Sequence, residues 1–119
     1  MDTADALRGA LDEWQAGINA REPARVSAVF TEDAIFQGLR PYTVGRPGVQ
    51  RYYDSQPLGM TVSYRILASR RPAPDVVFGY VLADFSFPEQ PSIALNIGVL
   101  VQRGPDGWRI GHYQASRIG

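Results

Sequence analysis

The residue best suited to acid–base chemistry in this chain is its single histidine, His112. A free histidine titrates at about pH 6.5, so its side chain can take up or release a proton at neutral pH. At the two-residue spacing of a strand, the last stretch of the sequence places one mixed set of side chains on a common face: Trp108, Ile110, His112, Gln114 and Ser116. We therefore expect His112 to face a partly buried site, where it could act as a general acid or base.

A histidine that transfers protons needs a second group to orient it or to stabilise its charge. Ser116 lies about 13 Å away along the strand, at about 3.3 Å per residue, which is too far for a nucleophile. Asp33, at the start of the first predicted strand, is the better candidate partner, because the pattern puts Asp84 on the opposite face of the sheet. The alternative is that His112 only orients a ligand through a hydrogen bond, without proton transfer.

An amide in the middle of an apolar strand is a second candidate. Asn96 stands between Leu95 and Ile97, and burying an unpaired amide there would cost free energy. We expect Asn96 to bind a ligand or a polar neighbour such as Gln114 or His112.

Several residue types that carry chemistry elsewhere are absent. The chain has no cysteine, and all 12 of its basic residues are arginine. These absences exclude thiolate nucleophiles, disulfides, finger-type zinc sites, Schiff bases and Walker-type phosphate clamps. One histidine cannot form a multi-histidine metal centre, although carboxylates could hold a hard cation weakly. We expect no cofactor: neither a metal ion nor a nicotinamide should bind tightly.

The composition is that of an ordinary globular chain. Its 119 residues are 45% hydrophobic and 20% charged, which suits one domain over residues 1–119. Twelve acidic residues balance 12 basic ones, which argues against nucleic acid or a membrane surface as a partner. The acidic start of the chain has neither a signal peptide nor an apolar run, so we expect a cytoplasmic protein.

Helices come first in the sequence and long strands follow. Apolar residues at helical spacing predict a helix over 3–21, and two shorter helices are predicted over 23–30 and 48–55. A short strand is predicted over 34–37, and four longer ones over 60–69, 76–87, 92–103 and 108–116. Tight turns that contain proline or glycine join the four long strands, so they should form an antiparallel meander. This order of elements predicts an α+β fold.

Two of the predicted strands are apolar on both faces. Over 76–87 and over 93–101, the positions of each face are largely apolar. Three short helices can cover only one side of the sheet, so we expect a homodimer through the open face. The alternative is that a few aromatic side chains simply remain exposed.

Three stretches of the sequence resemble a known family. Residues 11–36 (LDEWQAGINAREPARVSAVFTEDAIF) resemble the opening of the nuclear transport factor 2-like superfamily. Residues 44–53 (VGRPGVQRYY) and 107–116 (GWRIGHYQAS) are similar to its SnoaL-like branch, which is related to ketosteroid isomerases and polyketide cyclases. The resemblance implies a cone-shaped half-barrel, with three N-terminal helices packed on a curved antiparallel sheet around an apolar pocket, and dimerisation through the sheet.

The resemblance also implies which side chains line the pocket. Together with His112, these are Trp14, Phe30, Phe36, Tyr53, Asn96, Trp108, Ile110 and Gln114. Ketosteroid isomerases use a tyrosine, an aspartate base and a protonated aspartate. These groups align here with Trp14, Gly38 and Gly98, and because glycine cannot abstract a proton, that mechanism is excluded.

Three functions remain open. The first is an enzyme that enolises, cyclises or dehydrates a small, mainly apolar metabolite in a closed pocket, with His112 as the acid or base. The second is a carrier that binds such a metabolite without turnover. The third is a dimeric interaction module whose pocket is vestigial, and a pocket filled by the chain's own side chains would favour it.

Overall fold

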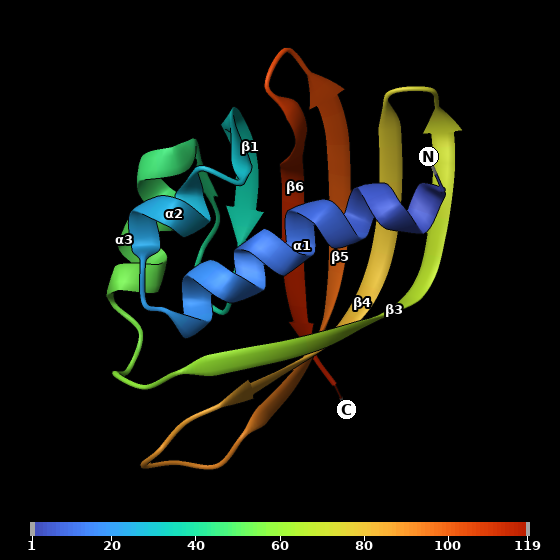
Figure 1. Ribbon diagram of the computed structural model, residues 1–119. Coiled ribbons are helices and arrows are strands. Elements are labelled where there is room, and N and C mark those ends of the chain that lie inside the picture. The colour runs from blue at the N-terminus through green and yellow to red at the C-terminus, as the bar shows by residue number, and fades with distance from the viewer. Residues whose placement is uncertain (1, 119) are drawn as a thin grey trace.

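The computed structural model describes residues 2–118. It is an α+β structure in which three helices lie on one side of a curved, unclosed sheet (Figure 1). Helix α1 (Thr3–Asn19) crosses the sheet and buries one apolar stripe, which includes Leu7, Leu11, Trp14 and Ile18. The spacing of these four residues is what predicted the helix over 3–21, and that prediction is confirmed.

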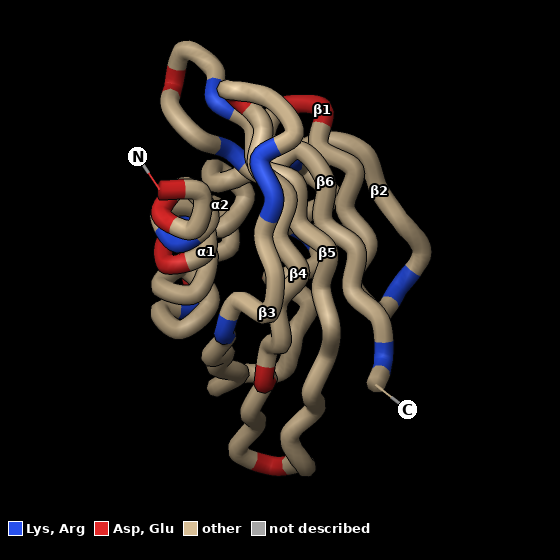
Figure 2. The backbone as a smooth tube through the Cα atoms, turned by 90° about the vertical axis from the view of Figure 1, so that its right-hand side faces the viewer, with Lys and Arg blue, Asp and Glu red and all other residues tan. Residues whose placement is uncertain are grey.

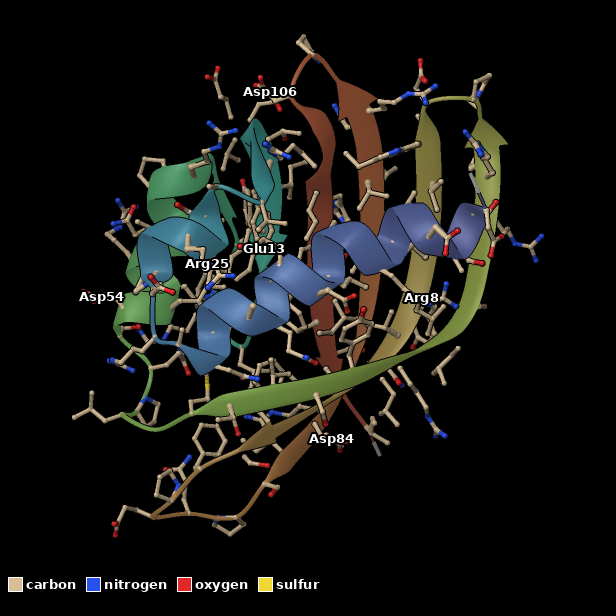
Figure 3. All side chains as sticks on the ribbon, in the orientation of Figure 1. Arg8, Glu13, Arg25, Asp54, Asp84 and Asp106 are labelled. Atoms are coloured by element: carbon tan, nitrogen blue, oxygen red, sulfur yellow. The ribbon has the colours of Figure 1, made fainter. Side chains whose placement is uncertain are left out.

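Two shorter helices pack beside α1. Helix α2 (Pro23–Ser27) begins with a proline in its first turn, and helix α3 (Arg46–Asp54) also has one there. Gly17 permits the close approach of α1 and α2, because a Cβ at this position would lie 2.8 Å from a methyl carbon of Val26. On the surface, Arg25 of α2 donates a hydrogen bond to the carboxylate of Glu13 on α1 (Figure 3).

The sheet has six strands in the order β2-β1-β6-β5-β4-β3. Their bounds are β1 (Phe30–Gln37), β2 (Thr43–Val44), β3 (Thr61–Ala73), β4 (Val76–Ser86), β5 (Ile93–Gly104) and β6 (Gly107–Arg117). The predicted antiparallel meander is confirmed for β3 to β6. The sheet as a whole is mixed and not antiparallel, because β1 pairs with β6 in parallel.

The start of β1 differs from the prediction. The helix predicted over 23–30 ends at Ser27, and the strand predicted from residue 34 already begins at Phe30. The cause is tertiary: Phe30 pairs with Ile110 of β6, and the Ile110 N–H donates to the Val29 carbonyl at 2.8 Å. Contacts with the far end of the chain therefore override the local helical pattern.

The core lies between the helices and the inner face of the sheet. Strand β5 alternates strictly, with Leu95, Ile97, Val99 and Val101 buried beneath the helices. The outer face is open, and Figure 2 shows α1 and α2 on one side of the sheet with no helix labelled on the other. No helix within residues 2–118 is long and apolar enough to cross a membrane.

Candidate functional site

Strand β6 contains an extra residue that changes which side chains point inward. Val101 of β5 lies opposite Ile110, but the next residue, Leu100, lies opposite His112, so Gly111 forms a bulge. Directly opposite residues share a face, and Leu100 belongs to the outer face of β5. The prediction that Ile110 and His112 share a face is therefore wrong: Ile110 is in the core, and His112 is on the outer face.

His112 has apolar lateral neighbours. It lies between Leu100 on β5 and Ile35 on β1, and no hydrogen bond or ion pair to it is present within residues 2–118. Its predicted partner Asp33 is exposed and accepts a hydrogen bond from the Thr31 hydroxyl at 3.0 Å. Asp33 lines a separate hollow of about 450 Å³ that also contains Arg46 and Arg109. The structure does not bring the predicted acid–base pair together.

The two predicted amides are also on the outer face. Asn96 lies opposite Leu82 on one side and Ser116 on the other, and Gln114 lies opposite Gly98. Asn96 is half-buried, and Gln114 is exposed to solvent. Neither amide lies on the inner face of the sheet, where the resemblance had placed both. The half-exposed position of Asn96 also removes the expected cost of burying an unpaired amide.

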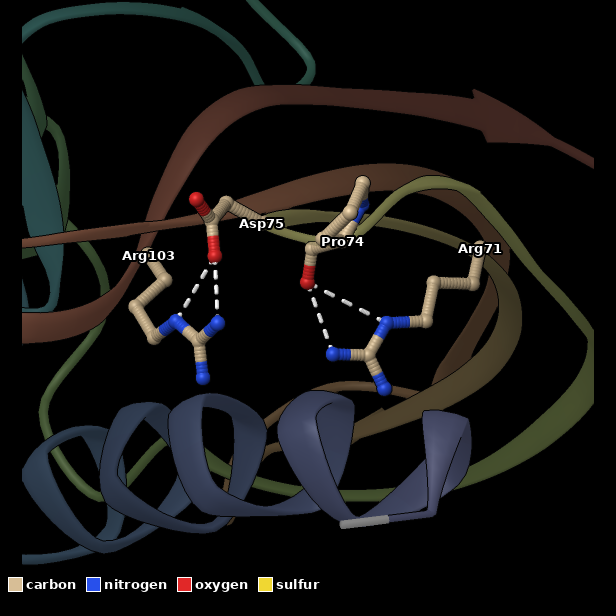
Figure 4. A network of polar contacts seen from close by, with 4 residues as sticks. All are labelled: Arg71, Pro74, Asp75 and Arg103. Carbon is tan, nitrogen blue, oxygen red and sulfur yellow. Dashed lines mark hydrogen bonds and ion pairs between the residues drawn. The ribbon is translucent and has the colours of Figure 1, made fainter.

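Trp108 lies at the end of the sheet where the β3–β4 and β5–β6 hairpins turn. The centroid of its ring is 5.8 Å from the guanidinium carbon of Arg71 and 5.4 Å from that of Arg103. Figure 4 shows the same two arginines bound to the β3–β4 turn, Arg103 to the Asp75 carboxylate and Arg71 to the Pro74 carbonyl. We call these five residues the tip cluster; Trp108 belongs to it and not to an interior pocket.

The remaining predicted aromatic residues meet in the interior. Trp14, Phe30, Phe36 and Tyr53 are all buried there, and Tyr113 lies among them. Tyr113 is 2% exposed and stacks on Phe36 with ring centroids 4.8 Å apart. The reasoning from sequence missed Tyr113, because uninterrupted alternation placed it on the outside. A glycine within a strand is a signal for a bulge, and Gly111 was that signal.

Three of these aromatic residues form a buried chain of hydrogen bonds. The indole N–H of Trp14 donates to the Tyr53 hydroxyl at 3.0 Å, and the Tyr53 hydroxyl donates to that of Tyr113 at 3.4 Å. Burial raises the pKa of Tyr53 and that of Tyr113 above the ordinary value for a phenol, because the phenolate would lose its solvation. Both hydroxyls are neutral at physiological pH, so they can donate hydrogen bonds but cannot act as bases.

Tyr113 also forms part of the wall of a small cavity. The cavity has a volume of about 100 Å³ and lies at the end of the sheet where the β4–β5 hairpin turns. Its lining comes from α3 and the loops beside it, from β4, β5 and β6, and from the β4–β5 turn. It consists of Leu39, Tyr52, Gln56, Pro57, Met60, Phe85, Phe87, Gln90, Ile93, Leu95 and Tyr113. None of these side chains is acidic, basic or a histidine. An apolar wall with a few uncharged polar groups is typical of small-molecule sites.

Tyr52 closes one side of this cavity over Gly38. A Cβ at residue 38 would lie 2.3 Å from the Tyr52 ring, and the Leu39 N–H donates to the Tyr52 hydroxyl at 3.1 Å. The tyrosine ring thus occupies the space that a side chain at residue 38 would need. Within residues 2–118, no acidic side chain lines the cavity in place of the aspartate base that the resemblance aligns with Gly38.

The wider surroundings of the site contain no metal centre. Within residues 2–118, no three histidine, aspartate or glutamate side chains lie close enough together to hold a metal ion.

Sequence comparison and structural comparison give different results for this chain. No protein-family model and no curated protein sequence matches it. A ketosteroid isomerase-like protein from Erwinia carotovora atroseptica superposes over 97% of this chain and 95% of its own, with a TM-score of 0.82 and 20% identity.

Two further solved structures extend this likeness. An NTF-2-like protein of unknown function from Shewanella oneidensis matches over 95% of this chain and 98% of its own, with a TM-score of 0.80 and 12% identity. A chain from Thiobacillus denitrificans assigned as a calcium/calmodulin-dependent protein kinase type II association domain covers 92% of this chain and 93% of its own, with a TM-score of 0.79 and 21% identity. Residues 2–118 therefore have the fold of the nuclear transport factor 2-like proteins.

Proposed function

We propose that this protein binds a small, mainly apolar molecule in the cavity beside Tyr113, and that it does so without turnover. The observation that carries the proposal is the lining: an apolar wall with two tyrosines and two glutamines, and no group that titrates near neutral pH. His112 and Asp33, the residues expected to supply acid–base chemistry, lie outside the cavity. This arrangement supports a carrier or sensor over an enzyme that enolises, cyclises or dehydrates its ligand.

The size of the cavity limits its occupant. A cavity of about 150 Å³ holds benzene, whereas this one measures about 100 Å³. A compact molecule no larger than benzene that stays partly in contact with solvent, or one end of a longer molecule, fits such a space; an enclosed polycyclic ligand does not. The interior aromatic residues fill the rest of the space between the helices and the sheet.

Binding is tested by titrating the protein with methylenecyclopentane, a compact hydrocarbon, and following backbone amide signals by NMR. We expect saturable shifts for residues around the cavity. Ile93→Trp should abolish them, because Ile93 lines the cavity and a larger ring would fill it. Ile35→Trp is the matched control, since Ile35 is 44% exposed on the outer face. No saturable binding to the wild type, or binding that survives Ile93→Trp, would contradict the proposal.

Turnover is tested separately with a ketone. Enolisation of cyclopentanone in D2O exchanges the hydrogens next to its carbonyl, which NMR detects directly. We expect no acceleration by the wild type and no difference for His112→Ala. An acceleration that is lost in His112→Ala would restore the enzymatic alternative.

A second role, dimerisation through the outer face, is supported by a continuous apolar row across the sheet. Phe78, Leu100, His112, Ile35 and Val44 lie side by side on five neighbouring strands, and Phe78, Ile35 and Val44 are 38%, 44% and 61% exposed. The chain assigned as an association domain shares this fold. Sedimentation equilibrium should show a dimer that Phe78→Asp dissociates, whereas Leu58→Asp, at an equally apolar surface position in the loop before β3, should leave it intact. A monomeric wild type would contradict this role.

A further inference from the structure

The buried chain of hydrogen bonds contains three donors and forms two hydrogen bonds. Trp14 contributes one N–H, and Tyr53 and Tyr113 contribute one O–H each, which makes three donors. Two hydrogen bonds join the three side chains, and no other hydrogen bond to these groups is present within residues 2–118. One hydroxyl proton is therefore left without an acceptor, whichever way the two tyrosines order their shared bond.

The surroundings of the two hydroxyls differ. The hollow that Tyr53 borders has a volume of about 10 Å³, which is at the lower limit for one water molecule. Tyr113 borders the cavity of about 100 Å³. With Tyr53 donating to Tyr113, the spare proton belongs to Tyr113, on the side of the network where a ligand has room.

We propose that the Tyr113 hydroxyl determines the specificity of the cavity, and that the ligand is a small neutral molecule whose apolar body carries one hydrogen-bond acceptor, such as a ketone oxygen. This inference rests on the proposed function, because it assigns the ligand of the same cavity. An unpaired buried donor costs free energy, and an acceptor on the ligand removes that cost. A hydrocarbon of the same shape leaves the donor unpaired.

The charge of the lining narrows the ligand class further. No arginine lines the cavity, and the chain contains no lysine, so a carboxylate or phosphate group would lose its solvation there without a compensating charge. A cationic ligand would likewise find no carboxylate in the wall. A neutral acceptor is the polar group that this wall can bind at the smallest desolvation cost.

The test compares two probes of nearly the same shape, cyclopentanone and methylenecyclopentane, by NMR titration. In the wild type, we define the ketone preference as the dissociation constant of the hydrocarbon divided by that of the ketone. Tyr113→Phe keeps the ring that stacks on Phe36 and removes only the hydroxyl. We expect this substitution to lower the ketone preference about three- to tenfold and to change the affinity for the hydrocarbon less than about twofold.

Three matched tyrosine-to-phenylalanine variants test whether the ketone preference depends on the Tyr113 hydroxyl alone. Tyr53→Phe should keep the ketone preference, because the Tyr113 hydroxyl remains. Tyr52→Phe removes the other hydroxyl of the wall, which accepts from the Leu39 N–H and keeps its own proton. Because Tyr52 is half-buried, solvent can accept that proton, so Tyr52→Phe should also keep the ketone preference. Tyr80→Phe, on the outer face, serves as the surface control.

Each outcome separates this inference from the function on which it rests. If neither probe binds saturably to the wild type, the proposed function itself fails. If the hydrocarbon binds but the ketone preference is unchanged in Tyr113→Phe, or is lost in Tyr52→Phe in its place, the cavity binds ligands and the role of Tyr113 is overturned. Loss of the preference in Tyr113→Phe alone supports both.

Discussion

The two faces of β6 differ more than the sequence of that strand indicates. Tyr113, on the inner face, is almost completely buried, stacks on an aromatic ring and joins a chain of hydrogen bonds. His112, its immediate neighbour, lies half-buried on the outer face between two aliphatic residues. The residue with the more versatile chemistry therefore lies outside the cavity, and a less reactive phenol forms part of its wall. In β6, the position of a residue relative to the bulge determines which face it occupies, whatever its chemical type.

The largest difference in stability is expected between two separate variants, each of which lacks one glycine: Gly98 of β5 or Gly111 of β6. Gly98 lies in regular pairing, so its deletion moves half of β5 by one residue and turns two inward side chains to the outer face. Each displaced side chain costs about 1.5–3 kcal/mol, and the total approaches the whole stability of a domain of this size. We expect the protein lacking Gly98 not to fold, as judged by circular dichroism and urea unfolding.

Deletion of Gly111 provides the matched case. Without the bulge, Ile110 still points inward, His112 outward and Tyr113 inward, because the extra residue is the one removed. We expect this variant to fold, with a loss of about 1–3 kcal/mol in the free energy of unfolding. Equal damage from both deletions would contradict the assignment of the bulge to Gly111.

A smaller difference in stability is expected between alanine variants of two phenylalanines in β4. Phe85 of β4 is 6% exposed on the inner face, and Phe78 is 38% exposed on the outer face. We expect Phe85→Ala to lower the free energy of unfolding by about 3–5 kcal/mol, and Phe78→Ala by less than about 1 kcal/mol in the monomer. Urea unfolding at low protein concentration checks both. Similar losses for the two variants would show that the faces are not distinct.

The smallest effect is a dependence of stability on alkaline pH. Burial raises the pKa of Tyr53 and Tyr113, so below about pH 10 both the folded and the unfolded chain keep these phenol protons. Above about pH 10 the unfolded chain loses protons that the folded chain retains, and stability must fall as pH rises. The expected slope is about 1.4 kcal/mol per pH unit for each buried tyrosine.

This slope is measured by urea unfolding between about pH 8 and 11. Because the chain has no lysine, tyrosines are the principal side chains that titrate in this range. The double variant Tyr53→Phe/Tyr113→Phe should reduce the slope, and Tyr80→Phe should not. A smaller slope should remain from Tyr64, because partial burial and the hydrogen bond to Asp12 also raise its pKa. A flat profile for the wild type would contradict the burial of the two hydroxyls.

Patterns within a single element predicted most of the fold. The stripe of Leu7, Leu11, Trp14 and Ile18 identified α1, and the turns rich in proline and glycine identified the four strands of the meander. The same local spacing placed Trp14 in the interior, and the family resemblance placed Tyr53 there. These signals succeed because periodicity reports directly which side of an element is buried.

Features that depend on distant parts of the chain could not be predicted in this way. The parallel pairing of β1 with β6 extends the strand back to Phe30, where the local pattern favoured a helix. The bulge at Gly111 inverts the face of every later residue of β6, and this single shift moved His112, Gln114 and Tyr113 at once. The unrecognised bulge therefore caused larger errors in the predicted site than in the predicted fold.

The tip cluster and the cavity lie at opposite ends of the sheet and differ in how far their residues are buried. The Arg103–Asp75 ion pair and the cation–π contact of Arg71 with Trp108 join the β3–β4 and β5–β6 hairpins. The cavity lies at the other end of the sheet, beside the β4–β5 hairpin. The contacts of the tip cluster join exposed hairpin turns, and exposed ion pairs contribute little to stability, whereas Phe85, Leu95 and Tyr113 beside the cavity are buried. The hairpin turns at the tip can therefore open locally without disturbing the buried wall of the cavity at the other end of the sheet.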